Sequence, residues 1–184
     1  TDTLTAGVHL NNRNVVEIVV KEGRDRVQEL IDVGTKFDKN VSNEYDLAME
    51  GGHSENRILH HKDITGKEII RALTEEVYRN NNIQVLDHHF SVDLITQHHF
   101  GETVTRKRED IKCFGAYVLN KKTGSTFKLL AKKTIMSTGG IGLVYNSTTN
   151  PLIATGDGIA MAYRAKAIVN DMEFIQFHPT ALYN

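Results

Sequence analysis

The sequence predicts an α/β fold that combines parallel strands, helices and an inserted β-meander. Two stretches, near residues 14–33 and 63–79, carry apolar residues at helical spacing. Short runs of β-forming residues occur at 83–86, 90–95 and 134–136. Alternation of such helices and strands is typical of a sheet covered by helices.

The first helix is expected to begin at a capping box formed by Asn14 and Glu17 and to end at Gly34. Gly23 interrupts its apolar face, so this stretch is either one helix or two. A glycine inside a helix loses more conformational entropy than other residues and weakens the helix without necessarily breaking it, so both alternatives stay open.

A second helix and a hairpin follow. The helix is expected to start between Asp63 and Thr65 and to end at the three asparagines 80–82. A glycine turn at 121–124 separates two alternating runs, 114–119 and 126–130, which predicts a β-hairpin.

The segment from 134 to 184 is the densest in candidate site residues. Its first strand ends at Thr138, Gly139 and Gly140, where two residues without Cβ allow another molecule to approach the backbone. Open α/β folds bind ligands at this edge of the sheet. Asp157 then opens an amphipathic helix, whose start suits either a plain N-cap or a ligand rich in oxygens.

Composition and charge exclude several classes of function. The 184 residues carry a formal net charge of -1, which argues against broad capture of nucleic acid or a membrane surface. No apolar run approaches the length of a membrane span, and the single cysteine, Cys113, cannot form an internal disulfide, as expected in the cytoplasm. Six of the nine histidines form adjacent pairs, whose rings would point to opposite faces of a strand, and no metal site is predicted.

Several motifs resemble the flavoproteins that include L-aspartate oxidase, succinate dehydrogenase and fumarate reductase, and the whole chain is most similar to the L-aspartate oxidase family within that group. The motifs are DTLTAG (2–7), EGGHSENRILHHKDITG (50–66), TGG (138–140), TTNP (148–151), TGDGIAMAYRA (155–165) and MEFIQFHPTALY (172–183). The resemblance implies a partial FAD-binding Rossmann-like domain at 1–173 and the start of a capping domain at 174–184. The family's G-x-G-x-x-G motif would lie upstream of Thr1.

The resemblance also implies the site residues. Residues expected to bind FAD are Phe90 and Ser91, beside the adenine, and Thr138, Gly139, Gly140 and Asp157. Glu50 would meet the amino group of the substrate, His178 would hydrogen-bond a substrate carboxylate, and Gln176 and Thr180 would flank His178. Without the resemblance, Glu50 is better explained as a solvated loop acid and His178 as an ordinary core or surface histidine. Glu50 and His178 are expected to act on one substrate over the flavin.

The implied reaction is oxidation of L-aspartate to iminoaspartate by non-covalent FAD, with dioxygen or fumarate as electron acceptor. In the family this step begins NAD biosynthesis, and the product passes to quinolinate synthase. Two alternatives remain open, namely part of a succinate dehydrogenase or fumarate reductase flavoprotein and a non-catalytic flavin-fold module. The chain by itself is expected to bind FAD weakly or not at all and to be inactive.

Overall fold

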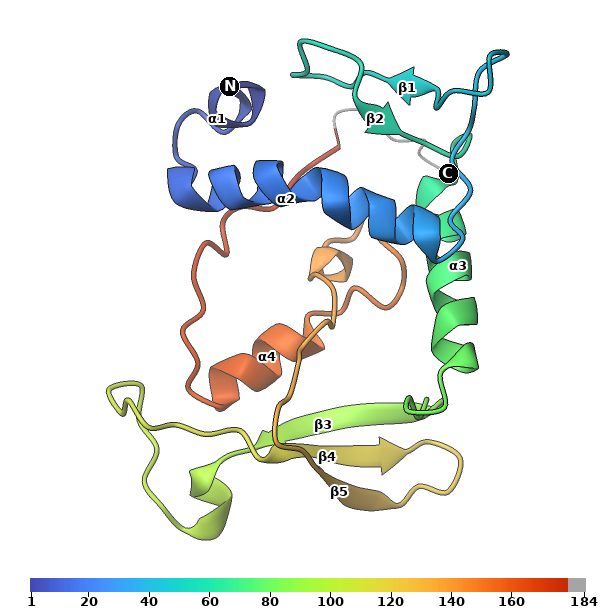
Figure 1. Cartoon of the computed structure of the whole chain (residues 1–184). Coiled ribbons are helices and arrows are strands. Elements are labelled where there is room, and N and C mark those ends of the chain that lie inside the picture. Colours follow the sequence, from blue (N-terminus) through green and yellow to red (C-terminus); the bar gives the residue numbers. More distant parts are fainter. Residues whose placement is uncertain (179–184) are drawn as a thin grey trace. The chain divides into compact units, whose positions relative to one another are not determined.

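The structure is a computed structural model that describes residues 1–178 (Figure 1). The chain divides into two compact units, unit 1 from Thr1 to Val85 and unit 2 beginning at Leu86. Among the described residues, no helix is both long enough and apolar enough to cross a membrane.

Unit 1 is mainly helical. Its elements are α1 (Asp2–Ala6), α2 (Arg13–Asp32), β1 (Leu47–Ala48), β2 (Ile58–Leu59) and α3 (Thr65–Arg79). The two short strands pair in antiparallel fashion. Helix α3 ends before the asparagines 80–82, as predicted.

The long helix α2 begins two residues earlier than predicted. Its cap is Asn12 and not Asn14, because the side-chain oxygen of Asn12 accepts the backbone N–H groups of Asn14 and Val15 at 3.1 and 3.3 Å. The helix passes through Gly23 without a break, so the stretch is one helix. It ends shortly before Gly34, which has a φ of 95°.

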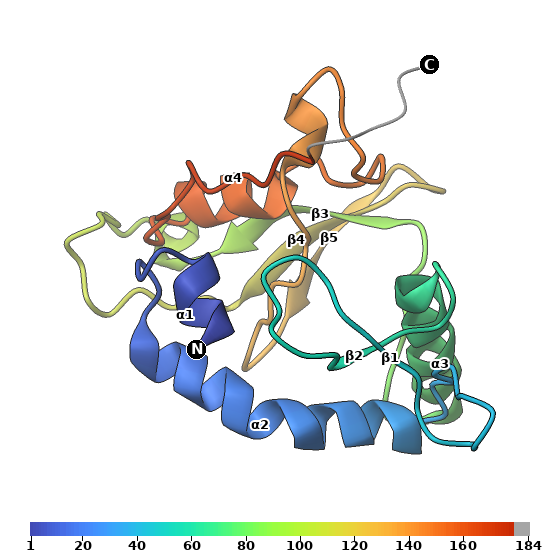
Figure 2. The ribbon, with the colours of Figure 1, turned by 90° about the horizontal axis from the view of Figure 1, so that it is seen from above.

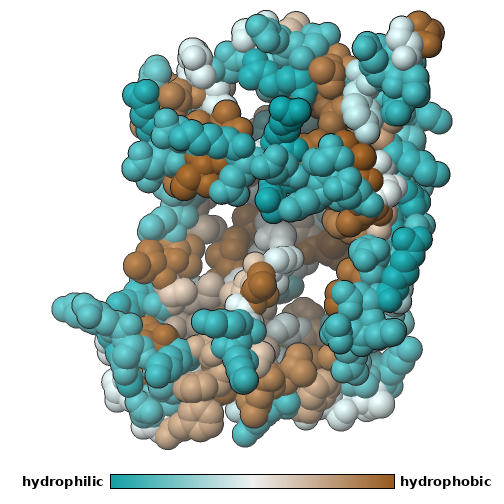
Figure 3. Space-filling view, in the orientation of Figure 1, coloured by the Kyte–Doolittle hydropathy of each residue, from teal (hydrophilic) through white to brown (hydrophobic). Residues whose placement is uncertain are grey.

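One side of α2 exposes apolar residues. Val15, Ile18 and Val19 retain 53%, 55% and 63% of their accessible surface. Figure 3 shows such brown apolar residues interspersed among teal hydrophilic ones on the face in view. Their i, i+3, i+4 spacing gives α2 the predicted apolar face, and these three residues of the face are exposed.

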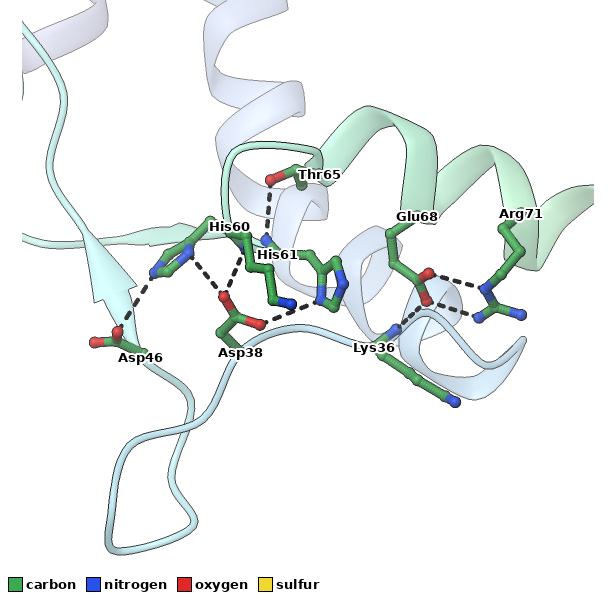
Figure 4. Close-up of polar contacts among 9 residues, drawn as sticks. Lys36, Asp38, Asp46, His60, His61, Thr65, Glu68 and Arg71 are labelled. Carbon is green, nitrogen blue, oxygen red and sulfur yellow. Dashed lines mark hydrogen bonds and ion pairs between the residues drawn. The ribbon is translucent and has the colours of Figure 1, made fainter.

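A buried carboxylate joins the end of α2 to α3 (Figure 4). Glu68 is 8% exposed and accepts hydrogen bonds from the backbone N–H of Lys36 at 2.8 Å and from Arg71 at 2.7 and 2.8 Å. Arg71 also donates to the carbonyl of Gly34 at 2.8 Å. The bonds from Arg71 first, and then from Lys36, lower the pKa of Glu68 to about 2.

A second carboxylate organises the loops around β2. Asp38 accepts the backbone N–H of Lys62 at 2.6 Å, which is the main reason that its pKa is lowered. The Nδ1 atoms of His60 and His61 lie 3.5 and 3.2 Å from the same carboxylate, as Figure 4 shows. The expectation that adjacent histidines face opposite ways is wrong for this pair, because β2 ends before His60. Residues 1–178 contain no group of three or more side chains suited to bind a metal ion.

Unit 2 contains a three-stranded antiparallel sheet and a helix. Its elements are β3 (His89–Ile95), β4 (Gly115–Asn120), β5 (Thr126–Leu130) and α4 (Asp157–Arg164), with short 3-10 turns at Gln97–Phe100 and Gly142–Val144. The strand order is β3-β4-β5. This meander confirms the predicted strand at 90–95 and the predicted hairpin.

Helix α4 packs against β3, and both views show the two elements side by side (Figures 1 and 2). Leu94 from β3 contacts Met161 from α4 and Ala165 at the C-cap of α4, and all three are less than 9% exposed. Cys113 packs against this cluster as a small half-buried side chain. The cluster fixes the helix on the sheet through apolar contact.

The predicted parallel strands are not observed in the part of the chain that the structure describes. Segments 83–86 and 134–136 have no regular secondary structure, and every strand pair among the described residues is antiparallel. A β-run becomes a strand only when its backbone groups find a neighbouring strand. Neither segment has such a neighbour among the described residues, so β-propensity alone was insufficient.

Candidate functional site

Unit 2 contains a cavity of about 610 Å³ between β3, the segment after residue 136 and the start of α4. All six residues predicted to bind the cofactor line it, namely Phe90, Ser91, Thr138, Gly139, Gly140 and Asp157. They come from three segments of the sequence. The structure thus brings the six together, while their role toward FAD stays a prediction.

Backbone hydrogen bonds set the predicted glycine turn beside the helix. The N–H of Gly156 donates to the carbonyl of Gly140 at 3.1 Å, so the two ends of the intervening loop lie next to each other. Gly158, in the first turn of α4, is in close contact with Thr138. A Cβ at position 158 would lie 1.8 Å from Thr138 Oγ1. The absence of a side chain at 158 therefore allows the TGG segment to lie against α4.

Asp157 is placed differently from the prediction. It is the first residue of α4, and the cap position belongs to Gly156, which has a φ of 77°. The carboxylate of Asp157 accepts a 2.5 Å hydrogen bond from the hydroxyl of Thr155. In the described residues no side chain caps α4, so its first-turn N–H groups stay open to an oxygen-rich ligand beside the cavity.

An ion pair that was not predicted ties the other end of α4 to β3. Arg164 donates to Asp93 at 3.0 Å and to the carbonyl of Val92 at 3.1 Å. The register of β3 shifts between Ser91 and Asp93, which leaves Val92 outside the ladder. Because Arg164 lies 71 residues from Asp93, no local pattern in the sequence marks the pair.

Glu50 lies in unit 1, in the loop between β1 and β2, and is exposed. The loop turns tightly there, because the N–H of His53 donates to the carbonyl of Glu50 at 3.1 Å. The N–H of Glu50 lies 3.4 Å from His53 Nδ1. The turn thus holds the backbone of Glu50.

The segment predicted to bind substrate belongs to unit 2. Gln176 and His178 are exposed, and Thr180 lies outside the described residues. Phe177 meets Tyr145 edge to face, with 5.2 Å between ring centroids, which joins this segment to the loop that follows the TGG turn. Neither Gln176 nor His178 lines the cavity. That Glu50 and His178 act on one substrate stays a prediction.

Comparison with known proteins decides the family. The family model described as "FAD binding domain" matches residues 1–184. The chain belongs to this FAD binding domain family.

Two curated relatives of the chain are L-aspartate oxidases. L-aspartate oxidase 2-b, chloroplastic, of Nicotiana tabacum is 47% identical over 98% of the chain, and L-aspartate oxidase 1 of Ralstonia nicotianae is 42% identical over 100%. The chain spans 27% and 34% of the lengths of these relatives. It therefore matches only part of each oxidase.

Two solved structures have a similar fold. Quinol fumarate reductase FrdA of E. coli gives a TM-score of 0.78 at 26% identity, with 89% of this chain and 26% of that chain covered. The Mycobacterium smegmatis Sdh1 complex in the apo form gives 0.74 at 32% identity, with 89% and 28% covered. The fold is thus that of part of a flavoprotein domain.

Proposed function

We propose that this chain is part of a flavin-dependent L-aspartate oxidase, located in the cytoplasm, that converts L-aspartate to iminoaspartate at the start of NAD biosynthesis. The observation that carries the proposal is the gathering of Phe90, Ser91, the TGG turn and Asp157 around one cavity. The relatives that match nearly the whole chain support the choice of substrate. Dioxygen or fumarate takes the electrons, and quinolinate synthase receives the product.

The lining of the cavity fits a dinucleotide such as FAD. Two adjacent glycines, Gly139 and Gly140, expose backbone without side chains, and the N-terminal end of α4 offers positive partial charge to phosphate oxygens. Phe90 presents an aromatic surface that is 42% exposed. FAD, when bound, supplies the acceptor for the hydride from the substrate Cα.

Glu50 is proposed to recognise the amino group of L-aspartate. A carboxylate attracts the ammonium form and can take a proton from it. Succinate has the same two carboxylates and lacks this amino group. Glu50 is therefore the residue expected to separate the two substrates.

His178 is proposed to hold a carboxylate of the substrate, with Gln176 and Thr180 beside it. A histidine ring has two nitrogens, each able to donate when the ring is protonated. The bond would orient the dicarboxylate for hydride removal from Cα, which is a positioning effect.

The decisive experiment uses the full-length polypeptide that contains this chain, assayed with L-aspartate and with succinate. Glu50→Gln is expected to lower kcat/KM for L-aspartate by about 100-fold, the effect of losing a charged hydrogen bond of about 2–3 kcal/mol. Glu55→Gln, an exposed residue of the same loop, is the matched control. Full retention of the preference for L-aspartate in Glu50→Gln would refute the proposal for this residue.

A second candidate is a succinate dehydrogenase or fumarate reductase flavoprotein. The TM-scores of 0.78 and 0.74 with FrdA and Sdh1 favour it, whereas the higher identities to L-aspartate oxidases speak for the first candidate. Turnover of succinate without turnover of L-aspartate would select this alternative. Turnover of neither substrate by a flavin-loaded full-length protein would select a non-catalytic module.

The 184-residue chain by itself is expected to bind FAD weakly or not at all. The visible absorbance of the flavin is the readout for a bound isoalloxazine, whose electronics the protein tunes. A yellow purified chain that keeps its colour through gel filtration would contradict this expectation.

A further inference from the structure

One carboxylate oxygen in unit 1 joins α1 to the loop that carries Glu50. Oδ2 of Asp2 accepts the backbone N–H of Ser54 at 2.8 Å and the Ser54 hydroxyl at 2.9 Å. The same oxygen accepts Nη2 of Arg57 at 2.5 Å, and Arg57 also donates to the Ser54 hydroxyl at 3.2 Å. Three donors from one loop therefore converge on a single atom more than 50 residues away in sequence.

The charge of Asp2 makes these bonds strong. Its side chain is 18% exposed, and that of Arg57 is 47% exposed. The backbone N–H of Ser54 contributes most, followed by its hydroxyl, and together with Arg57 they lower the pKa of Asp2 to about 2. Asp2 is thus ionised across the physiological pH range, and its bonds are charge-assisted.

Apart from the Glu50–His53 turn, which is internal to the loop, the loop has few other polar contacts. Between β1 and β2, residues 49–57 form no regular structure. At the base, the N–H of Arg57 donates to the carbonyl of Ala48 at 3.0 Å. At the tip, a Cβ on Gly52 would lie 3.7 Å from that of Ala6, so the tip is next to α1. Asp2 therefore supplies the polar anchor between the loop and the helix.

We propose that Asp2 is a positioning residue, whose carboxylate fixes the 49–57 loop on α1 and so presents Glu50 in one orientation to a substrate that carries an amino group. The inference rests on the proposed function of Glu50. A recognition group on a loop loses affinity when the loop must be ordered at the moment of binding. A loop that is already anchored avoids that loss and holds the reactive geometry.

The test compares Asp2→Asn with Asp25→Asn, a matched change at an exposed position of α2, in the full-length polypeptide. The first measurement is hydrogen exchange of the ligand-free protein. In Asp2→Asn the amides of residues 49–57 are expected to exchange about tenfold faster, while α2 is unchanged. The second measurement is steady-state kinetics. KM for L-aspartate is expected to rise about tenfold, with a much smaller change for succinate, because succinate has no amino group for Glu50 to meet.

A variant of Arg57, the partner of Asp2, distinguishes loss of this ion pair from a general loss of stability. Arg57→Gln is expected to act in the same direction, and the double variant Asp2→Asn/Arg57→Gln is expected to add little, because the two residues share one interaction. Additive effects on exchange would overturn the proposal.

The outcomes are distinguishable from failure of the proposed function. Equal exchange of residues 49–57 in Asp2→Asn and Asp25→Asn would overturn the anchor, whatever the kinetics. Faster exchange with equal losses for both substrates would overturn the positioning role. If Glu50→Gln itself leaves the substrate preference intact, the function of Glu50 fails, and the exchange comparison still decides whether Asp2 anchors the loop.

Discussion

Different interactions stabilise the inside of each unit. In unit 1, three carboxylates whose pKa values are lowered, Asp2, Asp38 and Glu68, join segments that are distant in sequence. In unit 2, the cluster of Leu94, Met161 and Ala165 holds the helix on a hydrogen-bonded sheet. Unit 2 also has a shifted carboxylate, Asp110, but this residue lies in the loop before β4 and pairs with Arg108.

The two units also place their candidate site residues by different interactions. The cavity of unit 2 is set by backbone hydrogen bonds and apolar packing, with one ion pair, Arg164–Asp93, between α4 and β3. The Glu50 loop of unit 1 is set by a carboxylate, which requires ionisation. We therefore expect the two candidate sites to respond differently to packing mutations and to acid.

The largest expected effect is a core truncation in unit 2. Leu94→Ala should destabilise this unit by about 3 kcal/mol, because it removes buried methyl groups and leaves a cavity under α4. Hydrogen exchange of β3 and β4 would rise, while α2 stays protected. The control is Leu129→Ala, a side chain that is 45% exposed, with an expected loss below about 1 kcal/mol. Equal losses in both variants would show that the cluster is not the core of unit 2.

A smaller effect is expected when a side chain is added at the cavity. Gly158→Ala would place a methyl group 1.8 Å from Thr138 Oγ1, which must move, at a cost of about 1–3 kcal/mol. The same substitution should lower the flavin affinity of the full-length polypeptide, as measured by fluorescence titration. Wild-type affinity in this variant would show that the contact between Thr138 and α4 does not shape the site.

Acid should destabilise unit 1 before unit 2, without any mutation. A carboxylate whose folded-state pKa is lowered contributes stability above its unfolded-state pKa, and this contribution is lost as pH falls through the folded-state pKa. For Asp2 and Glu68 this window runs from about 4 down to about 2. Hydrogen exchange measured through this window should show unit 1 losing protection before β3 to β5. Loss in the reverse order would contradict the comparison.

The smallest expected effect is a gain in unit 1. Gly23→Ala should stabilise α2 by about 0.5–1 kcal/mol, because Gly23 lies inside the helix and an added Cβ meets no atom within 4 Å. Chemical denaturation followed by circular dichroism would measure it. This variant is also the matched control for Gly158→Ala, since the substitution is the same. A loss of stability would mean that this side of α2 has a partner.

The sequence alone determined the features that depend on neighbours along the chain. The periodicity near 63–79 predicted α3, and the alternation around the glycine turn predicted the β4–β5 hairpin, because both patterns repeat over a few residues. The resemblance selected six residues that line one cavity, although it could not say that they meet.

Features that require a distant partner follow from the folded arrangement and not from local sequence. Segments 83–86 and 134–136 have β-propensity but no strand beside them among the described residues, and His60 turns with its neighbour toward Asp38. The bonds from Asp2 to Ser54 and from Arg164 to Asp93 span 52 and 71 residues. Side-chain identity encodes the chemistry of such a bond, whereas the folded path of the backbone decides which partner comes within reach.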